Sequence, residues 1–165
     1  MLLDEADART DTVRPAHPAQ GEEGFAWQDS FALGHTGMDE THQEVVDRVD
    51  ALLRVDDAGL PQALDAFGEH ARRHFAEEDA AMRETAYGSS GCHIDEHAAV
   101  LRSLHEVSAA LDDGRIEVVR AFARALADWF PEHAQVMDQG LARWLVQRQL
   151  GGAPVVIRRR QPVAA

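Results

Sequence analysis

The chain of 165 residues has little cysteine: Cys92 is the single one, so no intrachain disulfide can form. Basic side chains are also scarce, since 16 Lys and Arg stand against 29 Asp and Glu, a formal net charge of −13. A field of that sign repels nucleic acid and anionic membrane surfaces, so we expect neither as a partner. Apolar runs long enough to cross a bilayer are missing, and the acidic start MLLDEADARTD does not resemble a signal peptide. We therefore expect one soluble, cytoplasmic domain.

Both ends of the chain lack a regular apolar pattern. Residues 1–24 are interrupted by proline and glycine, and we predict a flexible tail there. Residues 25–37 carry aromatic side chains without a helical period, which indicates an arm packed on the outside of the domain, with Trp27 as its anchor. Residues 151–165 include APVVIRRRQPVAA, which is either a docking peptide for a partner or a flexible end; we favour the flexible end.

The segment between the tails, residues 25–150, has the apolar periodicity of four helices. Apolar side chains recur at steps of three and four over about residues 38–54, 61–87, 93–111 and 116–150, with short breaks rich in Asp and Gly. No strand pattern is present. Four helices joined by short connections predict an all-α, antiparallel up-down-up-down four-helix bundle, a fold that commonly holds metal sites between facing helices.

Two pairs of metal-ligand residues lie on neighbouring predicted helices. His74 with Glu78, and His93 with His97, are each four residues apart, so each pair lies on one face of its helix. A single pair of this kind is usually a surface pair. The first and fourth helices offer further ligand types at corresponding depths, which gives a candidate set of seven: His42, His74, Glu78, His93, His97, His133 and Asp138.

The interval from His133 to Asp138 does not suit a regular helix. Five residues turn two side chains about 140° apart at 3.6 residues per turn, so the two could not both face inward. Pro131 removes a helical hydrogen bond just before this point. We therefore predict a local π-helical turn or kink that rotates Asp138 back toward His133.

Imidazole and carboxylate ligands suit first-row transition metals, and seven are too many for one tetrahedral zinc ion. The sequence therefore predicts two metal ions. If both carboxylates and one oxo or hydroxo group bridge the ions, and three histidines bind one ion while two bind the other, one coordination position stays open on one ion. A small ligand such as dioxygen can bind there, and two ferrous ions can each supply one electron.

The residues closely resemble the hemerythrin family in its bacterial branch, over about Phe25 to Leu150. The resemblance rests on Trp27, Gly34, the run DETH ending at His42, the run HFAEE from His74 to Glu78, Met82, Tyr87, HIDEH from His93 to His97, and Trp129, His133 and Asp138. It implies a non-haem protein that holds two iron ions with an oxo or hydroxo bridge and binds dioxygen reversibly as a carrier, store or sensor.

The resemblance also implies a role for each residue. His93, His97 and His133 would hold the six-coordinate iron, His42 and His74 the iron with the open position, and Glu78 and Asp138 would bridge them. Apolar side chains of the oxygen pocket would be Val45, Phe75, Trp129, Phe130 and Ala134. The sequence does not identify a protein partner, which stays unknown. The alternatives are a diiron enzyme that reduces peroxide or nitric oxide, and iron buffering; no separate acid/base pair favours the enzyme.

Two positions depart from the family pattern. Ala134 stands where the family usually has a larger aliphatic residue, with Pro131 just before it, so we expect a roomier, wetter pocket and faster autoxidation. His35 replaces a usually aliphatic residue. His35, His70 and His105 are not among the seven candidate metal ligands and are expected to be hydrogen-bonded or exposed. His70, one turn before His74, is the best candidate to contact a metal-binding residue without binding the metal itself. Cys92, expected in a loop, is interpreted as incidental.

Overall fold

The computed structural model describes residues 24–151, so the predicted tails lie outside the described residues except for their inner ends. The elements in chain order are the short 3₁₀ helix η1 (Asp29–Phe31), α1 (Thr36–Arg54), α2 (Leu60–Glu84), α3 (Ser90–Asp112), α4 (Ile116–His133), the π-helical turn η2 (Ala134–Asp138) and α5 (Gln139–Gln149). Over this range there is no strand, and the predicted all-α class is confirmed.

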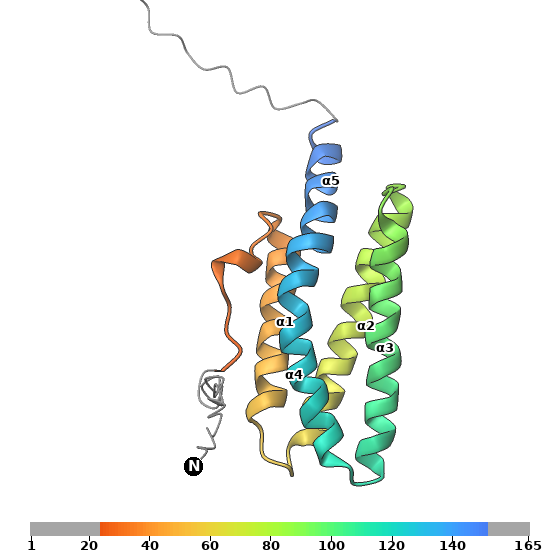
Figure 1. Ribbon diagram of the computed structural model, residues 1–165. Coiled ribbons are helices and arrows are strands. Elements are labelled where there is room, and N and C mark those ends of the chain that lie inside the picture. Colours follow the sequence, from red (N-terminus) through yellow and green to blue (C-terminus); the bar gives the residue numbers. More distant parts are fainter. Residues whose placement is uncertain (1–23, 152–165) are drawn as a thin grey trace, which may run out of the picture.

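The helices form an antiparallel four-helix bundle. α1 packs on α2, α2 on α3, α3 on α4, and α4 closes the ring against α1. α4, η2 and α5 continue as one long helix, whose last turns extend beyond the N-terminal end of α1 (Figure 1). Because three short connections join four long helices, residues that share a depth on neighbouring helices come face to face. Among the described helices, none is both long and apolar enough to span a membrane.

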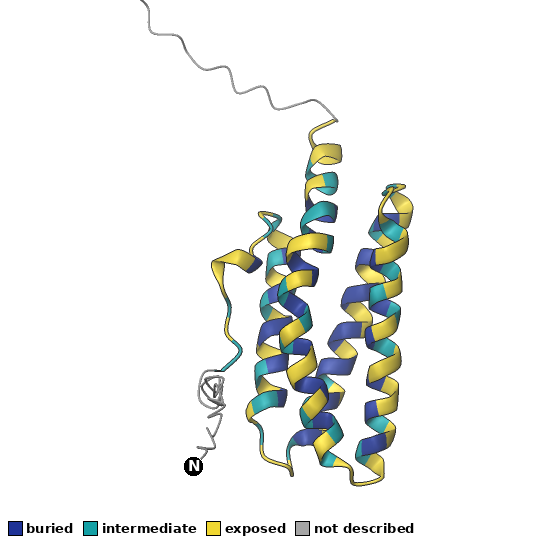
Figure 2. Ribbon diagram, viewed as in Figure 1, coloured by how far each residue is buried: buried dark blue, intermediate teal, exposed yellow. Residues whose placement is uncertain are grey.

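The core lies along the axis of the bundle. Buried residues follow the inward faces of the helices, and exposed residues cover the outward faces (Figure 2). Most of the buried apolar side chains form one cluster that fills the bundle on one side of the histidines, and a smaller cluster of Met38, Met82, Leu141 and Ala142 fills the other side. The polar residues in the middle are therefore enclosed by apolar packing at both ends.

The N-terminal arm lies along the outside of the bundle, as the sequence predicted (Figure 1). Its anchor is different from the expected one. Phe31, in η1, is 1% exposed and packs edge-on against Phe130 of α4 at 5.3 Å between ring centroids, whereas Trp27 is half-buried and packs edge-on against Phe31 at 5.9 Å. The 3₁₀ turn at Asp29–Phe31 is what points Phe31 inward, and the sequence pattern did not reveal that turn.

The start of α1 is fixed by two side chains. His35 caps the helix, because its Nδ1 accepts a hydrogen bond from the backbone N–H of Met38 at 3.4 Å. Asp39 accepts hydrogen bonds from the backbone N–H groups of Leu33, at 2.6 Å, and Gly34, at 3.1 Å. Gly34 has φ of +76°, a conformation that glycine adopts without strain. The helix therefore begins nearly two turns before the candidate ligand His42, which holds that residue at a fixed height.

The predicted π-helical turn between His133 and Asp138 is present. The backbone N–H of Gln139 donates to the carbonyl of Ala134, five residues earlier, and Pro131 lies inside α4 one turn before this point. The wide turn adds one residue to the helical repeat, so Asp138 faces the axis of the bundle and is fully buried. The local irregularity is thus what brings two side chains five residues apart to one site.

Candidate metal centre

The structure brings all seven candidate ligands together at mid-depth in the bundle. All four helices of the bundle contribute: His42 from α1, His74 and Glu78 from α2, His93 and His97 from α3, and His133 and Asp138 from α4 and the adjoining turn η2. Each side chain is buried, with at most 5% of its surface exposed. Burial of seven polar groups in an otherwise apolar core is costly unless something compensates them.

The two oxygens of Asp138 face different histidines. Oδ1 lies 2.9 Å from Nε2 of His93 and 3.3 Å from Nε2 of His133, while Oδ2 lies 3.1 Å from Nε2 of His42. One carboxylate therefore stands between two groups of imidazoles.

Glu78 repeats this division from the second helix. Its Oε2 lies 3.4 Å from Nε2 of His97 and 3.6 Å from Nε2 of His93, while its Oε1 lies 3.8 Å from Nε2 of His74. Both carboxylates thus separate the same two groups. We call His93, His97 and His133 the three-histidine half, and His42 and His74 the two-histidine half.

The inward-facing atoms have the arrangement of a metal site rather than of a hydrogen-bond network. Within residues 24–151, both oxygens of Glu78 and of Asp138, and Nε2 of four of the five histidines, have no partner in hydrogen-bond geometry despite lying 2.9–3.8 Å from one another. Buried polar atoms without partners are rare and call for an explanation. Nitrogen and oxygen donors that converge in this way suit first-row transition metals, so the cluster is suited to binding metal ions.

The protonation of the metal-free site supports this interpretation. Burial alone lowers the pKa of His93, but the carboxylates of Asp138 and Glu78 raise it to about 9. The same balance, with Asp138 as the main partner, raises the pKa of His42. The pKa of Asp138 is lowered well below its usual value, because the surrounding histidines outweigh its burial. In the metal-free protein, protons on the histidines stand where metal ions would otherwise neutralise the two carboxylates.

Two further carboxylates orient the three-histidine half from outside. Asp79 Oδ1 lies 2.8 Å from Nδ1 of His97, and Glu96 Oε2 lies 2.7 Å from Nδ1 of His133. Glu96 also accepts a hydrogen bond from the indole N–H of Trp129 at 3.3 Å. Metal-binding histidines usually donate their second N–H to such a carboxylate, which fixes the ring and its tautomer. The sequence analysis missed Asp79 and Glu96; the signal was their position next to Glu78 and His97 in the chain.

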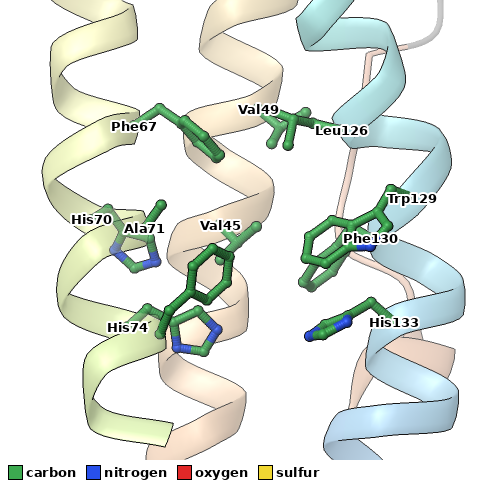
Figure 3. Close-up of a pocket in the computed structure, with 11 residues that line it drawn as sticks. Val45, Val49, Phe67, His70, Ala71, His74, Leu126, Trp129, Phe130 and His133 are labelled. Atoms are coloured by element: carbon green, nitrogen blue, oxygen red, sulfur yellow. The ribbon is translucent and has the colours of Figure 1, made fainter. Parts of the chain in front are cut away.

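A small apolar cavity of about 10 Å³ adjoins the centre, and both His74 of the two-histidine half and His133 of the three-histidine half line it (Figure 3). Four of the five predicted pocket residues line it: Val45, Phe75, Trp129 and Phe130. The fifth, Ala134, is fully buried in the core and is not among the lining residues. The expectation of a roomy pocket is therefore wrong. The π-helical turn places Ala134 in the packed core, and the bulk of Phe67, Trp129 and Phe130 fills the space. A cavity of this size holds about one water molecule.

A second, more open cavity of about 220 Å³ lies on the opposite side of the centre. Its lining includes His74 and Glu78 together with His35, Glu77 and Leu141. His74 and Glu78 are 4% and 5% exposed, whereas the other five candidate ligands are at most 2% exposed. The two-histidine half is thus the less enclosed part of the centre.

The remaining singled-out residues have structural explanations. His35 caps α1, and His105 is exposed on α3. Cys92 is exposed in the first turn of α3, so its expected position in a loop is wrong; α3 begins at Ser90, three residues before His93. His70 is different, because it is 1% exposed, lines the small cavity and stacks on His74.

Fold and site together define a four-helix-bundle metal-binding protein. The profile described as "Hemerythrin HHE cation binding domain" matches residues 33–145. The chain is 34% identical over 122 residues to the bacteriohemerythrin of Ralstonia nicotianae, covering 74% of this chain and 89% of the relative. It is 27% identical over 116 residues to a myohemerythrin of Riftia pachyptila, covering 69% of this chain and 88% of the relative. The chain therefore belongs to the hemerythrin family.

The fold agrees with solved structures as well. A crystal structure of a hemerythrin point mutant superposes with a TM-score of 0.67 at 22% identity, covering 73% of this chain and 95% of that one. At 22% identity this similarity is evidence for the shared fold only.

Proposed function

We propose that this protein holds two iron ions, joined by Glu78, Asp138 and an oxo or hydroxo bridge, and binds dioxygen reversibly as a carrier, store or sensor. The names of its relatives, bacteriohemerythrin and myohemerythrin, support the proposal. So does the ligand set, which combines five imidazoles with two carboxylates.

The observation that carries the proposal is the unequal division of the centre. Three imidazoles and one oxygen of each carboxylate surround one half, while two imidazoles and the other oxygens surround the second half. His42 and His74 would thus hold the second ion with one nitrogen fewer than the first, which would leave one position for a small ligand. Bound iron would supply the electrons for binding such a ligand.

The chain's own residues keep that position small and dry. Val45, Phe75 and Phe130 line the cavity beside the two-histidine half, and each is at most 6% exposed. Apolar walls exclude water and charged molecules, so a small neutral ligand is favoured over ions. The volume of about 10 Å³ leaves no room for an organic substrate within this cavity. We therefore propose a binding role rather than an enzymatic one, and a cytoplasmic location, which the single cysteine supports.

Optical spectra of the full-length protein test this function. The protein is reduced without air, exposed to air, and then freed of oxygen under vacuum or inert gas. We expect a colour change with air and recovery of the colourless reduced form afterwards, with two irons per chain. Irreversible oxidation in the first cycle would contradict reversible binding and favour the enzymatic alternative.

A variant of the cavity sharpens the same test. Phe75→Leu enlarges the small cavity beside the centre, where Phe75 stacks on His97 at 4.1 Å between ring centroids, so water enters more easily. We expect faster irreversible oxidation with unchanged iron content. The matched control is Phe122→Leu, a buried phenylalanine of the same core that does not line the cavity. An equal effect of both variants would show that general loosening, rather than the cavity wall, controls oxidation.

A further inference from the structure

The open cavity of about 220 Å³ has no part in the dioxygen binding proposed above, yet it reaches the metal centre. Of the seven candidate ligands, only His74 and Glu78 line it. Glu78 is 5% exposed, and neither of its carboxylate oxygens has a hydrogen-bond partner within residues 24–151. A buried carboxylate of this kind is costly unless a partner of opposite charge compensates it. The inner end of the cavity is therefore suited to a cation.

The outer end of the cavity also carries a carboxylate. Glu77 is exposed and lines the same cavity, so it lies at the mouth. The other polar side chains nearby are engaged with the start of α1, because Thr41 donates to the carbonyl of Gly37 at 2.8 Å and His35 accepts from the backbone N–H of Met38. None of the described lining residues is Lys or Arg. Two carboxylates, one outer and one inner, thus mark a path for positive charge.

The small cavity on the other side of the centre does not offer such a path. Its described lining contains no carboxylate, and its volume of about 10 Å³ holds about one water molecule. A metal ion that entered there would lose nearly all of its hydration shell without compensation. The open cavity has room for several water molecules, so a cation can keep part of its shell while it approaches Glu78.

We propose that the open cavity is the entry route for divalent metal ions, with Glu77 binding the hydrated cation at the mouth and Glu78 taking it into the centre. Glu78 suits this step because its Oε1 faces His74 and its Oε2 faces His93 and His97. A first ion can therefore pass to the three-histidine half before a second ion fills the two-histidine half. The proposal rests on the two-metal centre of the proposed function, but it needs neither iron nor dioxygen.

The role of Glu77 is tested by the rate of metal uptake. Full-length protein freed of metal with a chelator is mixed with cobalt(II), a coloured divalent ion, and the absorbance of the bound ion is followed. We expect Glu77→Gln to slow uptake about fivefold at low salt, because one unit charge is removed from the path of a dication. Salt at about 1 M should remove most of this difference. Glu69→Gln, an exposed residue of α2 outside both cavities, is the matched control.

The route itself is tested by narrowing the cavity. Ala81 lines it and is half-buried, so Ala81→Leu places a larger side chain in the path. We expect slower uptake of cobalt(II), and slower release of bound metal to a chelator, at both low and high salt, because the obstacle is steric. Ala80→Leu, at the exposed neighbouring position that does not line the cavity, is the matched control and should leave both rates unchanged.

Final metal content separates an entry residue from a ligand. In every variant we expect two metals per chain at the end of the reaction, measured by mass spectrometry after desalting. A lower final content in Glu77→Gln, or equal slowing in Glu69→Gln, would overturn capture by Glu77. Unchanged rates in Ala81→Leu would overturn the route. A wild-type protein that never takes up two metals would contradict the centre of the proposed function, whereas normal uptake with no effect of any variant contradicts the entry route only.

Discussion

The two halves of the centre are built from the same imidazoles but are supported differently. In the three-histidine half, His97 and His133 are each oriented by an outer carboxylate, and all three rings are at most 2% exposed. Nδ1 has no hydrogen-bond partner within the described chain in His93 of this half and in His42 of the two-histidine half. The three-histidine half has more orienting contacts and borders the small cavity through His133, whereas the two-histidine half borders both cavities through His74.

The two halves are expected to differ in metal affinity and in ligand exchange. Outer carboxylates raise the basicity of histidine ligands and fix their rings, so the three-histidine half should hold its metal more tightly. A half with fewer ligands and fewer orienting contacts leaves room for exchange at the open position. The variants and conditions below are ordered from the largest expected effect to the smallest.

Asp138→Ala should weaken both halves of the centre at once. Asp138 contributes one oxygen to each half, so its loss weakens both metal positions and leaves buried imidazoles without their main partner. We expect loss of most bound metal, measured as metal per chain by mass spectrometry after desalting. Asp128→Ala, an exposed residue of α4, is the control and should retain two metals. Full retention of both metals by Asp138→Ala would contradict the bridging role.

The pH dependence of stability should change sign with metal. In the metal-free protein the pKa of His93 is raised to about 9 from 6.5, so its protonated ring stabilises the fold fully below pH 6.5, and this contribution is lost as pH rises through 9. We expect a decrease in the free energy of unfolding on the order of 3 kcal/mol between about pH 6.5 and 9.5. The raised pKa of His42 acts in the same direction.

Metal loading reverses this trend, because metal binds the neutral imidazole and competes with the proton. Urea unfolding of metal-free and metal-loaded protein at both pH values measures the difference. The pKa of His74 is lowered to about 4 by burial, so its contribution changes only below pH 6.5, outside this window. A metal-free protein that gains stability toward the alkaline end of this range would rule out the charged His93.

Removing the outer carboxylates should lower the metal affinity of the three-histidine half toward that of the two-histidine half. Asp79→Ala and Glu96→Ala each leave a histidine without its orienting partner, and we expect a loss of about 10- to 100-fold in metal affinity. Competition with a coloured chelator measures it. Asp95→Ala, next to Glu96 but exposed, is the matched control. Should the control lose as much affinity as Glu96→Ala, net charge rather than orientation would be responsible.

The smallest effect is expected at Ala134. If Ala134 made the pocket roomier, as its departure from the family pattern led us to expect, Ala134→Ile would narrow the pocket and lengthen the lifetime of the oxygenated form. Because Ala134 is fully buried and does not line the cavity, the larger side chain should instead overpack the core and cost about 1–2 kcal/mol of stability, without a longer lifetime. Thermal unfolding and the oxidation rate are measured together. A longer lifetime at unchanged stability would show that the side chain reaches the cavity after all.

Much of this was accessible from the sequence because helices impose a local period. Spacings of four placed His74 with Glu78 and His93 with His97 on single faces, and the spacing of five between His133 and Asp138 predicted the π-helical turn. Asp79 and Glu96 were missed because their contacts cross between helices. The same holds for the contact of Glu44 with His70, which joins α1 to α2.

The sequence by itself determined the helices, the seven ligand types and the face of the helix on which each lies, since these depend on residues a few positions apart. Only the tertiary structure decided how the two oxygens of each carboxylate are shared, which imidazoles have an outer partner, and which side chains line the cavity. Those features depend on the rotation and depth of each helix against its neighbours. Packing of the whole core sets both, so no local spacing can reveal them.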